Sequence, residues 1–304
     1  MKEKYHLKKY LLFSFGLAWI FQMAASVMAI MGIGAGFTLL ASVSMFGPFA
    51  AVWITCGGLK QEKTGILWKP QFKGKVRWWI VSWLLPILLS LTGCGLYFLI
   101  LPDRFDPTAS EYIIATVGEE VYLQSFGMVQ PAVFMLIILF QILGGAFFNM
   151  FFALGEEAGW RGYLYPALKQ KYGTTKGKVF GGIIWGIWHW PVMMLAGYEY
   201  GWSIFNAPLY LVLAGMLFFC VVTTAFGMME DWLYERTGNI WAPSLAHGAI
   251  NAAAGFGMYF LKIKYAHEMY LGPVTVGMIS GIPFFLLAGY LLIKELHHGG
   301  NQRQ

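Results

Sequence analysis

Eight long apolar segments constrain this chain more than any other feature of its sequence. A helix rises about 1.5 Å per residue, so about 20 residues cross a hydrocarbon core of about 30 Å. An isolated strand cannot satisfy its backbone hydrogen bonds in lipid, so each segment is predicted to be a helix. The sequence therefore predicts an all-α polytopic membrane protein with eight transmembrane helices. The segments run at 10–31, 35–57, 78–101, 129–154, 178–197, 204–228, 239–261 and 270–293.

The composition supports a membrane protein and argues against a soluble one. Of the 304 residues, 58% are apolar and only 12% are charged, whereas soluble domains carry about 25% charged residues. The net charge of +6 comes from basic residues that lie mostly between the apolar segments. Membrane topology explains this pattern better than binding to nucleic acid does. Cys56, Cys94 and Cys220 lie in apolar stretches without paired spacing, so no disulfide or zinc knuckle is predicted.

The distribution of basic residues predicts the orientation of the bundle. With the N-terminus inside the cell, all but three of the 21 Lys and Arg residues fall on the cytoplasmic side. The three exceptions are Arg104, Lys262 and Lys264, and the loop 102–127 that contains Arg104 is otherwise acidic. Because cytoplasmic loops are enriched in Lys and Arg, we predict that both termini are cytoplasmic. The short loops are typical of a bacterial plasma membrane protein.

The domain organisation is predicted to be simple, because no internal repeat, low-complexity tract or linker divides the chain. Residues 1–304 are expected to form one membrane domain, with the lipid bilayer as its surroundings. The first segment follows Lys8 and Lys9, yet it is too long for the apolar region of a cleaved signal peptide, so it is predicted to be retained. Within the domain we distinguish three N-terminal spans at 10–101, a core at about 130–260 and a last span at 270–293.

Ionisable side chains within membrane segments are costly and therefore indicate function. The first group lies at the cytoplasmic end of the fourth segment, in the sequence Gly155-Glu-Glu-Ala-Gly-Trp-Arg161. Glu157 and Arg161 are four residues apart and can pair on one helix face. Glu156 points about 100° away from Glu157. We therefore predict a structural pair, Glu157 with Arg161, and one free carboxylate, Glu156.

Two further polar groups lie inside the fifth and seventh segments. His189 follows Trp185 by four residues and precedes Pro191, which is expected to kink the helix. His247 and Asn251 are also four residues apart, so they share a helix face. Both segments run outward from the cytoplasmic side, and all these side chains are therefore expected to meet in the cytoplasmic half of the bundle.

An acid, two imidazoles and an amide in one water-accessible cavity are the components of a hydrolytic site. Glu156, with help from His189, could take a proton from water. His247 and Asn251 could donate hydrogen bonds to the oxyanion of a tetrahedral intermediate. The alternative for these polar groups is structural, as hydrogen bonds that hold the helices together.

The three motifs resemble those of the CPBP family. This family comprises the CAAX prenyl endopeptidases of the Ras-converting type and bacterial relatives in bacteriocin processing and immunity, also called the Abi family. The motifs are Glu156-Glu157 with Arg161, Trp185 with His189, and His247 with Asn251. The second motif usually opens with Phe, and an aromatic spacer should tolerate the exchange to Trp185. The motifs cover residues 156–251, and the first three spans resemble the family only in topology.

The resemblance implies an intramembrane endopeptidase that cleaves a peptide or a membrane-protein tail. In the family's prenyl proteases the first Glu and the second-motif His activate water, and the third-motif His and Asn form the oxyanion hole. These roles correspond to Glu156, His189, His247 and Asn251. The family is often classed as metallopeptidases, and Glu156, His189 and His247 could ligate zinc. No HExxH motif is present and Asn is a poor zinc ligand, so we favour a mechanism without a metal or other cofactor.

Two other functions remain open at this point. A non-catalytic immunity or scaffold protein of the same fold would use the motifs as interhelical contacts. A small-molecule transporter would use intramembrane Glu and His as a proton relay. Transporters often contain inverted repeats with broken helices in both halves, whereas the polar groups of this chain lie only in its second half. We therefore expect a peptidase. The immunity or scaffold protein is the second choice, and the transporter is the third.

Overall fold

The structure, a computed structural model that describes residues 5–301, is almost entirely helical. Within these residues, the one isolated β-bridge joins Phe105 to Leu261. The predicted all-α fold is therefore confirmed. Six helical segments are long and apolar enough to cross a membrane. They are Leu7–Ile30, Gly34–Cys56, Val76–Ile100, Ala132–Tyr172, Thr174–Ala196 and Leu209–Thr237.

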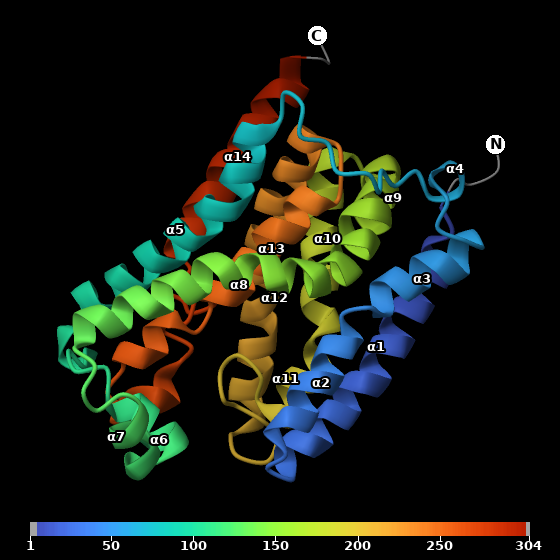
Figure 1. Ribbon diagram of the computed structural model, residues 1–304. Helices are drawn as coiled ribbons and strands as arrows, with labels where there is room; N and C mark the ends of the chain where they lie inside the picture. The colour runs from blue at the N-terminus through green and yellow to red at the C-terminus, as the bar shows by residue number, and fades with distance from the viewer. Residues whose placement is uncertain (1–4, 302–304) are drawn as a thin grey trace.

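The N-terminal part of the chain packs α1 against α2 and α3, while α5 lies beside the later helices α13 (Trp241–Ala253) and α14 (Ile282–Asn301) (Figure 1). The second apolar segment is broken at Met45 and Phe46, directly before Pro48 at the start of α3, because proline lacks the N–H that would continue the helical hydrogen bonds. The elements are α1 (Leu7–Ile30), α2 (Gly34–Ser44), α3 (Gly47–Cys56), α4 (Gln61–Thr64), α5 (Val76–Ile100), η1 (Pro102–Arg104), α6 (Glu111–Val117) and α7 (Glu119–Ser125).

The second half of the chain forms the centre of the molecule, with α13 packed on α8 and α10 packed on α12. The fourth segment continues well beyond its predicted end at residue 154, through a π-helical turn into α9. The elements are α8 (Pro131–Gly159), η2 (Trp160–Leu164), α9 (Tyr165–Tyr172), α10 (Thr174–Trp188), α11 (Trp190–Ala196), α12 (Leu209–Thr237), α13 (Trp241–Ala253), η3 (Phe256–Phe260), η4 (Ile263–Glu268) and α14 (Ile282–Asn301).

The last two predicted spans contain less regular helix than their apolar lengths indicate. In the segment 239–261 the helix α13 ends at Ala253, and 3-10 turns follow. In the segment 270–293 the helix α14 begins only at Ile282. The stretch before it contains the Gly272-Pro273 pair, and both residue types oppose helix formation. An apolar stretch of spanning length therefore does not guarantee a continuous helix.

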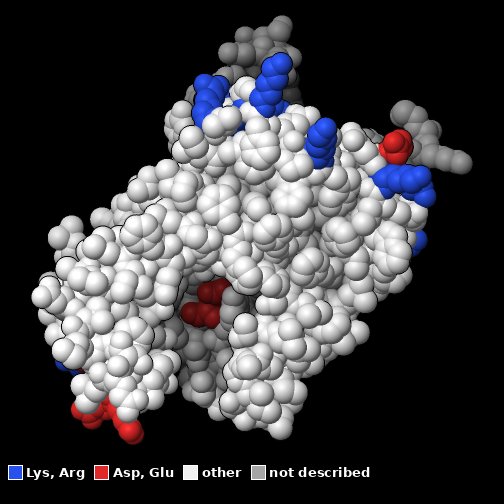
Figure 2. All heavy atoms as spheres, in the orientation of Figure 1, with Lys and Arg blue, Asp and Glu red and all other residues white. Residues whose placement is uncertain are grey.

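The two ends of the bundle differ in charge. α1 begins and α14 ends at the same end of the molecule, whereas α6, α7 and the α11–α12 loop lie at the opposite end (Figure 1). Most of the visible Lys and Arg side chains gather at the end where α14 finishes, and most of the visible surface Asp and Glu side chains gather at the other (Figure 2).

Close helix contacts bring the future site residues together. A Cβ atom on Gly182 of α10 would lie 2.3 Å from the Thr224 Cα atom of α12. A Cβ atom on Gly248, next to His247 in α13, would lie 2.5 Å from the Ala146 carbonyl oxygen of α8. Both distances are too short for any side chain, so glycine is required where these helices touch. Small residues permit the same kind of close approach in membrane bundles generally.

Candidate active site

Glu156 and Glu157 lie near the C-terminal end of α8, where the helix passes into the π-helical turn η2. Both are buried, with Glu156 2% exposed and Glu157 fully enclosed. A π-helical turn is often associated with functional sites because it redirects the side chains around it. Here the turn contains Arg161 and Trp160, and these two residues bind the two carboxylates separately.

Two tryptophan N–H groups hold the Glu156 carboxylate. Trp160 Nε1 donates to Glu156 Oε2 at 3.0 Å, and Trp185 Nε1 from α10 donates to the same oxygen at 2.7 Å. Hydrogen bonds to an ionised acceptor are stronger than neutral ones. Because both donors bind Oε2, the Oε1 atom remains available. Glu156 is thus fixed in orientation but has no cation bound to it in the described part of the chain.

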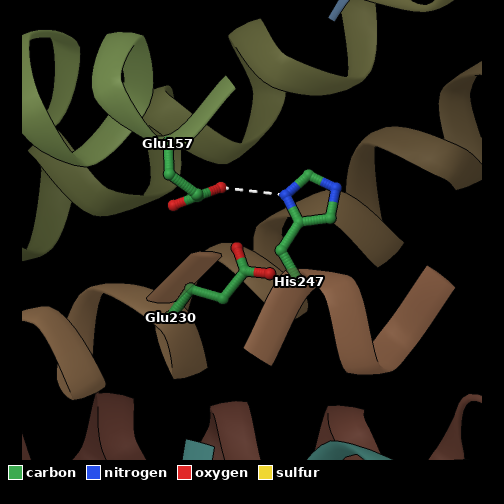
Figure 3. A group of neighbouring side chains, drawn as sticks. All are labelled: Glu157, Glu230 and His247. Carbon is green, nitrogen blue, oxygen red and sulfur yellow. Dashed lines mark hydrogen bonds and ion pairs between the residues drawn. The ribbon is translucent and has the colours of Figure 1, made fainter. Parts of the chain in front are cut away.

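Glu157 belongs to a separate buried cluster with Arg161, Glu230 and His247. Arg161 Nη1 donates to Glu157 Oε1 at 2.9 Å, as the spacing of four residues predicts. Arg161 Nη2 also forms an ion pair of 2.6 Å with Glu230 Oε2 of α12. His247 Nδ1 lies 3.0 Å from Glu157 Oε1 and donates to it (Figure 3). One guanidinium therefore bridges two carboxylates, and one of these carboxylates also holds the imidazole.

Aromatic rings enclose the guanidinium of Arg161. The Arg161 Cζ atom lies 4.6 Å from the centroid of the Tyr165 ring and 4.9 Å from that of the Trp185 ring. A guanidinium stacks well on aromatic faces. The N–H of Trp185 thus binds Glu156, while its ring covers the guanidinium that binds Glu157.

His189 occupies the break between α10 and α11, two residues before Pro191. Its Nδ1 atom lies 3.0 Å from the Trp185 carbonyl oxygen. A carbonyl can only accept a hydrogen bond, so Nδ1 carries the proton and Nε2 of the neutral ring carries the lone pair. Trp188 and Phe219 pack against the ring, with centroid distances of 4.7 and 5.1 Å. The predicted kink at Pro191 is thus present, and it begins at His189.

One cavity of about 330 Å³ connects the four side chains that the sequence predicts to be catalytic. Glu156, His189, His247 and Asn251 all line it, whereas Glu157 and Arg161 do not. Asn251 is exposed, and its amide has no hydrogen-bond partner among the described residues. Figure 2 shows a hollow in the middle of the molecule with acidic side chains inside it. A larger apolar hollow of about 600 Å³ between α10, α12 and α14 contains none of these residues.

Metal ligation is possible at a different set of residues from the one that the sequence predicts. Glu157, Glu230 and His247 place ligand atoms within 4.8 Å of one another (Figure 3), and carboxylate and imidazole groups are ligands that zinc accepts. The expected set was Glu156, His189 and His247, of which only His247 belongs to this group. Arg161 already binds both carboxylates of the group.

Sequence reasoning missed Glu230 and the indole donors. The sixth segment was predicted to end at residue 228, but α12 continues to Thr237 and carries Glu230 into the buried cluster. The adjacent acids Glu230 and Asp231 at the end of an apolar run were the available signal. Trp185 was interpreted as an aromatic spacer, yet its N–H donates to Glu156, which a phenylalanine cannot do.

The fold and the site together define an integral membrane protein with a buried acid–histidine cavity. Residues 132–253 match the family model described as type II CAAX prenyl endopeptidase Rce1-like. All three motifs lie within this range. The match confirms the predicted resemblance to the CPBP family over this region of the chain. The similarity to this family supports a peptidase.

A curated relative agrees with the family match. CAAX prenyl protease 2 of Methanococcus maripaludis is 30% identical to this chain over 127 residues. The match covers 35% of this chain and 45% of the relative, so the chain spans about half the length of that protein.

Proposed function

We propose that this protein is an intramembrane endopeptidase that cleaves a peptide or a membrane-protein tail. The observation that carries the proposal is the shared cavity of Glu156, His189, His247 and Asn251. The cavity is thus lined by an acid, by an imidazole whose Nε2 atom is free, and by two further polar side chains. The family of the matched region and the name of its archaeal relative support the same reaction class.

Glu156 is proposed to act as the general base. Its Oε2 atom is held by two indole N–H groups, so Oε1 is the atom that takes a proton from water. His189 Nε2, which carries a lone pair when Nδ1 donates to Trp185, accepts a second hydrogen bond from the same water. The resulting hydroxide-like oxygen attacks the peptide carbonyl, and Glu156 returns the proton to the leaving amine.

His247 and Asn251 are proposed to stabilise the oxyanion that forms on the attacked carbonyl. Two buried carboxylates, Glu157 and Glu230, face one guanidinium, Arg161. A protonated His247 makes this cluster electrically neutral, and burial favours a neutral cluster. With Nδ1–H donated to Glu157, the second N–H at Nε2 is free for the oxyanion. The amide of Asn251 supplies the other donor.

The proposed mechanism uses no metal ion. A cation held by Glu157, Glu230 and His247 would lie beside the Arg161 guanidinium, which already neutralises both carboxylates. Like charges at such short distances repel strongly in a buried site. Loss of activity with a tight chelator and its return with zinc would replace this mechanism with a metal-dependent one.

We further propose eight crossings with both termini in the cytoplasm and the chemistry in the cytoplasmic half of the bilayer. α13 and α14, with the turns beside them, would supply the seventh and eighth crossings. His247 lies six residues from the start of α13, or about 9 Å. The gathering of Lys and Arg at one end of the bundle supports this orientation (Figure 2).

Removal of the Asn251 amide tests the proposal without disturbing the fold. Asn251→Ala is expected to lower kcat by about 10²- to 10³-fold, the usual effect of losing one oxyanion donor, with KM and thermal stability unchanged. The assay uses purified protein in liposomes and a library of short fluorogenic peptides, some of them prenylated. Gln141→Ala on the exposed face of α8 is the matched control and should retain full activity.

Each contrary outcome of this assay identifies a different error. Normal activity in Asn251→Ala would remove Asn251 from the mechanism. If folded wild-type protein cleaves no peptide in the library, the result would favour the non-catalytic immunity or scaffold function. In that case a cellular phenotype that survives Asn251→Ala would support binding without catalysis.

Trp185→Phe tests whether the indole N–H orients the base. The substitution removes the 2.7 Å hydrogen bond to Glu156 but keeps an aromatic ring beside Arg161 and His247. We expect kcat to fall about tenfold with little change in KM, because the base loses its alignment. Trp190→Phe, at the apolar hollow between α10, α12 and α14, should have no such effect. Equal kinetics of the Trp185→Phe variant and wild type would restore the spacer interpretation.

A further inference from the structure

One part of the cavity wall comes from α1, α2 and the α11–α12 loop. Gln22 of α1 and Thr38 of α2 belong to it, and both lie outside the region that matches the family. Tyr198 and Glu199 of the loop complete this wall. The described cavity lining contains two carboxylates, Glu156 and Glu199, and no Lys or Arg side chain.

Gln22 is a buried amide without a partner. The residue is 2% exposed, and neither its Nε2 nor its Oε1 atom has a hydrogen-bond partner among the described residues. Leaving both ends of a buried amide unpaired costs free energy. Because the side chain lines the cavity, a ligand can pair both ends at once. A peptide bond offers one donor and one acceptor, which match this amide.

Glu199 is held in the cavity wall by its loop. Its backbone has a φ of 74°, a left-handed conformation that is unfavourable for a residue with a side chain and often occurs at functional sites. The Tyr200 hydroxyl donates to the Val276 carbonyl oxygen at 3.0 Å, and Asn206 Nδ2 donates to the Gly201 carbonyl oxygen at 2.9 Å. These contacts fix the loop directly after Glu199.

The Glu199 carboxylate lacks a cationic partner. None of the ion pairs between described residues includes it. Glu199 is half-buried, and its desolvation raises its pKa to about 7 although a hydrogen bond with Tyr198 acts in the opposite direction. The positive charge of His247 in the same cavity is matched by Glu157. The unbalanced charge of the cavity is therefore negative.

We infer that the cavity selects a peptide segment with a Lys or Arg side chain close to the cleaved bond, with Glu199 as its counter-charge and Gln22 bound to the peptide backbone. This inference rests on the proposed peptidase function. One cavity of about 330 Å³ contains both Glu156 and Glu199, so the cation lies within a few residues of the bond. The preference concerns charge in the peptide itself and is separate from any lipid group that the substrate carries.

The test compares peptides that differ in one charge. A hydrophobic host peptide carries Lys, Gln or Glu at each position in turn, and cleavage is measured with wild type, Glu199→Gln and the exposed control Glu119→Gln. At one or two positions, wild type should prefer Lys over Glu by at least about tenfold in kcat/KM. Glu199→Gln should lose this preference while its cleavage of the Gln peptide stays normal. The Glu119→Gln control should behave as wild type.

A second variant tests the backbone contact. Gln22→Leu should raise KM by about tenfold for all three peptides, because each loses the same hydrogen bonds, and it should leave kcat and the charge preference unchanged. Thermal unfolding of each variant confirms that the fold is intact. A fall in kcat without a change in KM would contradict the role of Gln22.

The outcomes separate this inference from the proposed function. Cleavage without charge preference, or an equal loss for all peptides in Glu199→Gln, overturns the inference and leaves the peptidase in place. Binding of the same labelled peptides to protein in nanodiscs is measured in parallel. A third outcome is that no peptide is cleaved, but wild type binds the Lys peptide preferentially and Glu199→Gln does not. This outcome overturns the peptidase function and keeps the charge selection. Absence of both cleavage and preference overturns both.

Discussion

Glu156→Gln should abolish peptide cleavage, with a fall in kcat of about 10³-fold or more, because an amide cannot accept the proton of the attacking water. The substitution is nearly isosteric. The amide oxygen can still accept the N–H groups of Trp160 and Trp185, which bind the carboxylate at 3.0 and 2.7 Å. The amide nitrogen then occupies the position of Oε1. We therefore expect a folded protein with an intact cavity and no base.

The experiment measures single-turnover cleavage and peptide binding on the same preparation. Glu156→Gln should bind peptide as wild type does, so that only the chemical step is lost. The exposed Glu62→Gln controls for the general removal of a carboxylate. If Glu156→Gln retains more than about a tenth of wild-type activity, general base catalysis by Glu156 is wrong, and His189 becomes the principal candidate.

Much of the fold could be predicted because the bilayer restricts the choices. Apolar length alone gave six segments that the structure also finds to be long and apolar enough to cross a membrane. Their ends were less predictable, because helices continue beyond the apolar region. α12 extends to Thr237 and the fourth segment extends to Tyr172. The irregular stretch before Ile282 could not be predicted from apolar length, because its glycines and Pro273 lie within an apolar run.

The site was predictable where the relevant contacts are local along a helix. A spacing of four residues predicted the pair of Glu157 and Arg161, and it placed His247 and Asn251 on one face, where both line the cavity. Contacts between distant segments could not be predicted this way. The bond from Trp185 to Glu156 joins residues 29 apart, and that from His247 to Glu157 joins residues 90 apart. These contacts depend on how the helices pack.

The two adjacent glutamates have different surroundings because the helix turns them toward different neighbours. Glu156 faces a cavity and receives neutral donors, which keeps its charge unbalanced. Glu157 faces a cation and an imidazole, which fixes both of them. The proposed mechanism needs both arrangements, since a base must remain free to take a proton whereas an oxyanion donor must be held in place. Whether the cavity residues carry catalysis remains a prediction that the variants above test.

Arg161→Met should destabilise the folded protein by about 3–5 kcal/mol, the usual cost of removing one partner from a buried ion pair. The guanidinium is fully enclosed and bridges Glu157 and Glu230, at 2.9 and 2.6 Å. Its loss leaves two buried carboxylates with only His247 between them. The variant should show a lower apparent melting temperature in detergent and lower accumulation in membranes than wild type.

A second substitution separates the charge effect from lost packing. Arg161→Met combined with Glu230→Gln removes one negative charge and leaves Glu157 with His247, so we expect it to recover more than half of the lost stability. Arg236→Met changes an exposed arginine on the same helix as Glu230 and should shift stability by no more than about 0.5 kcal/mol. If Arg161→Met is as stable as Arg236→Met, the guanidinium does not hold the cluster together. If the double variant is no more stable than Arg161→Met, the loss arises from packing around Tyr165 and Trp185 and not from unpaired charge.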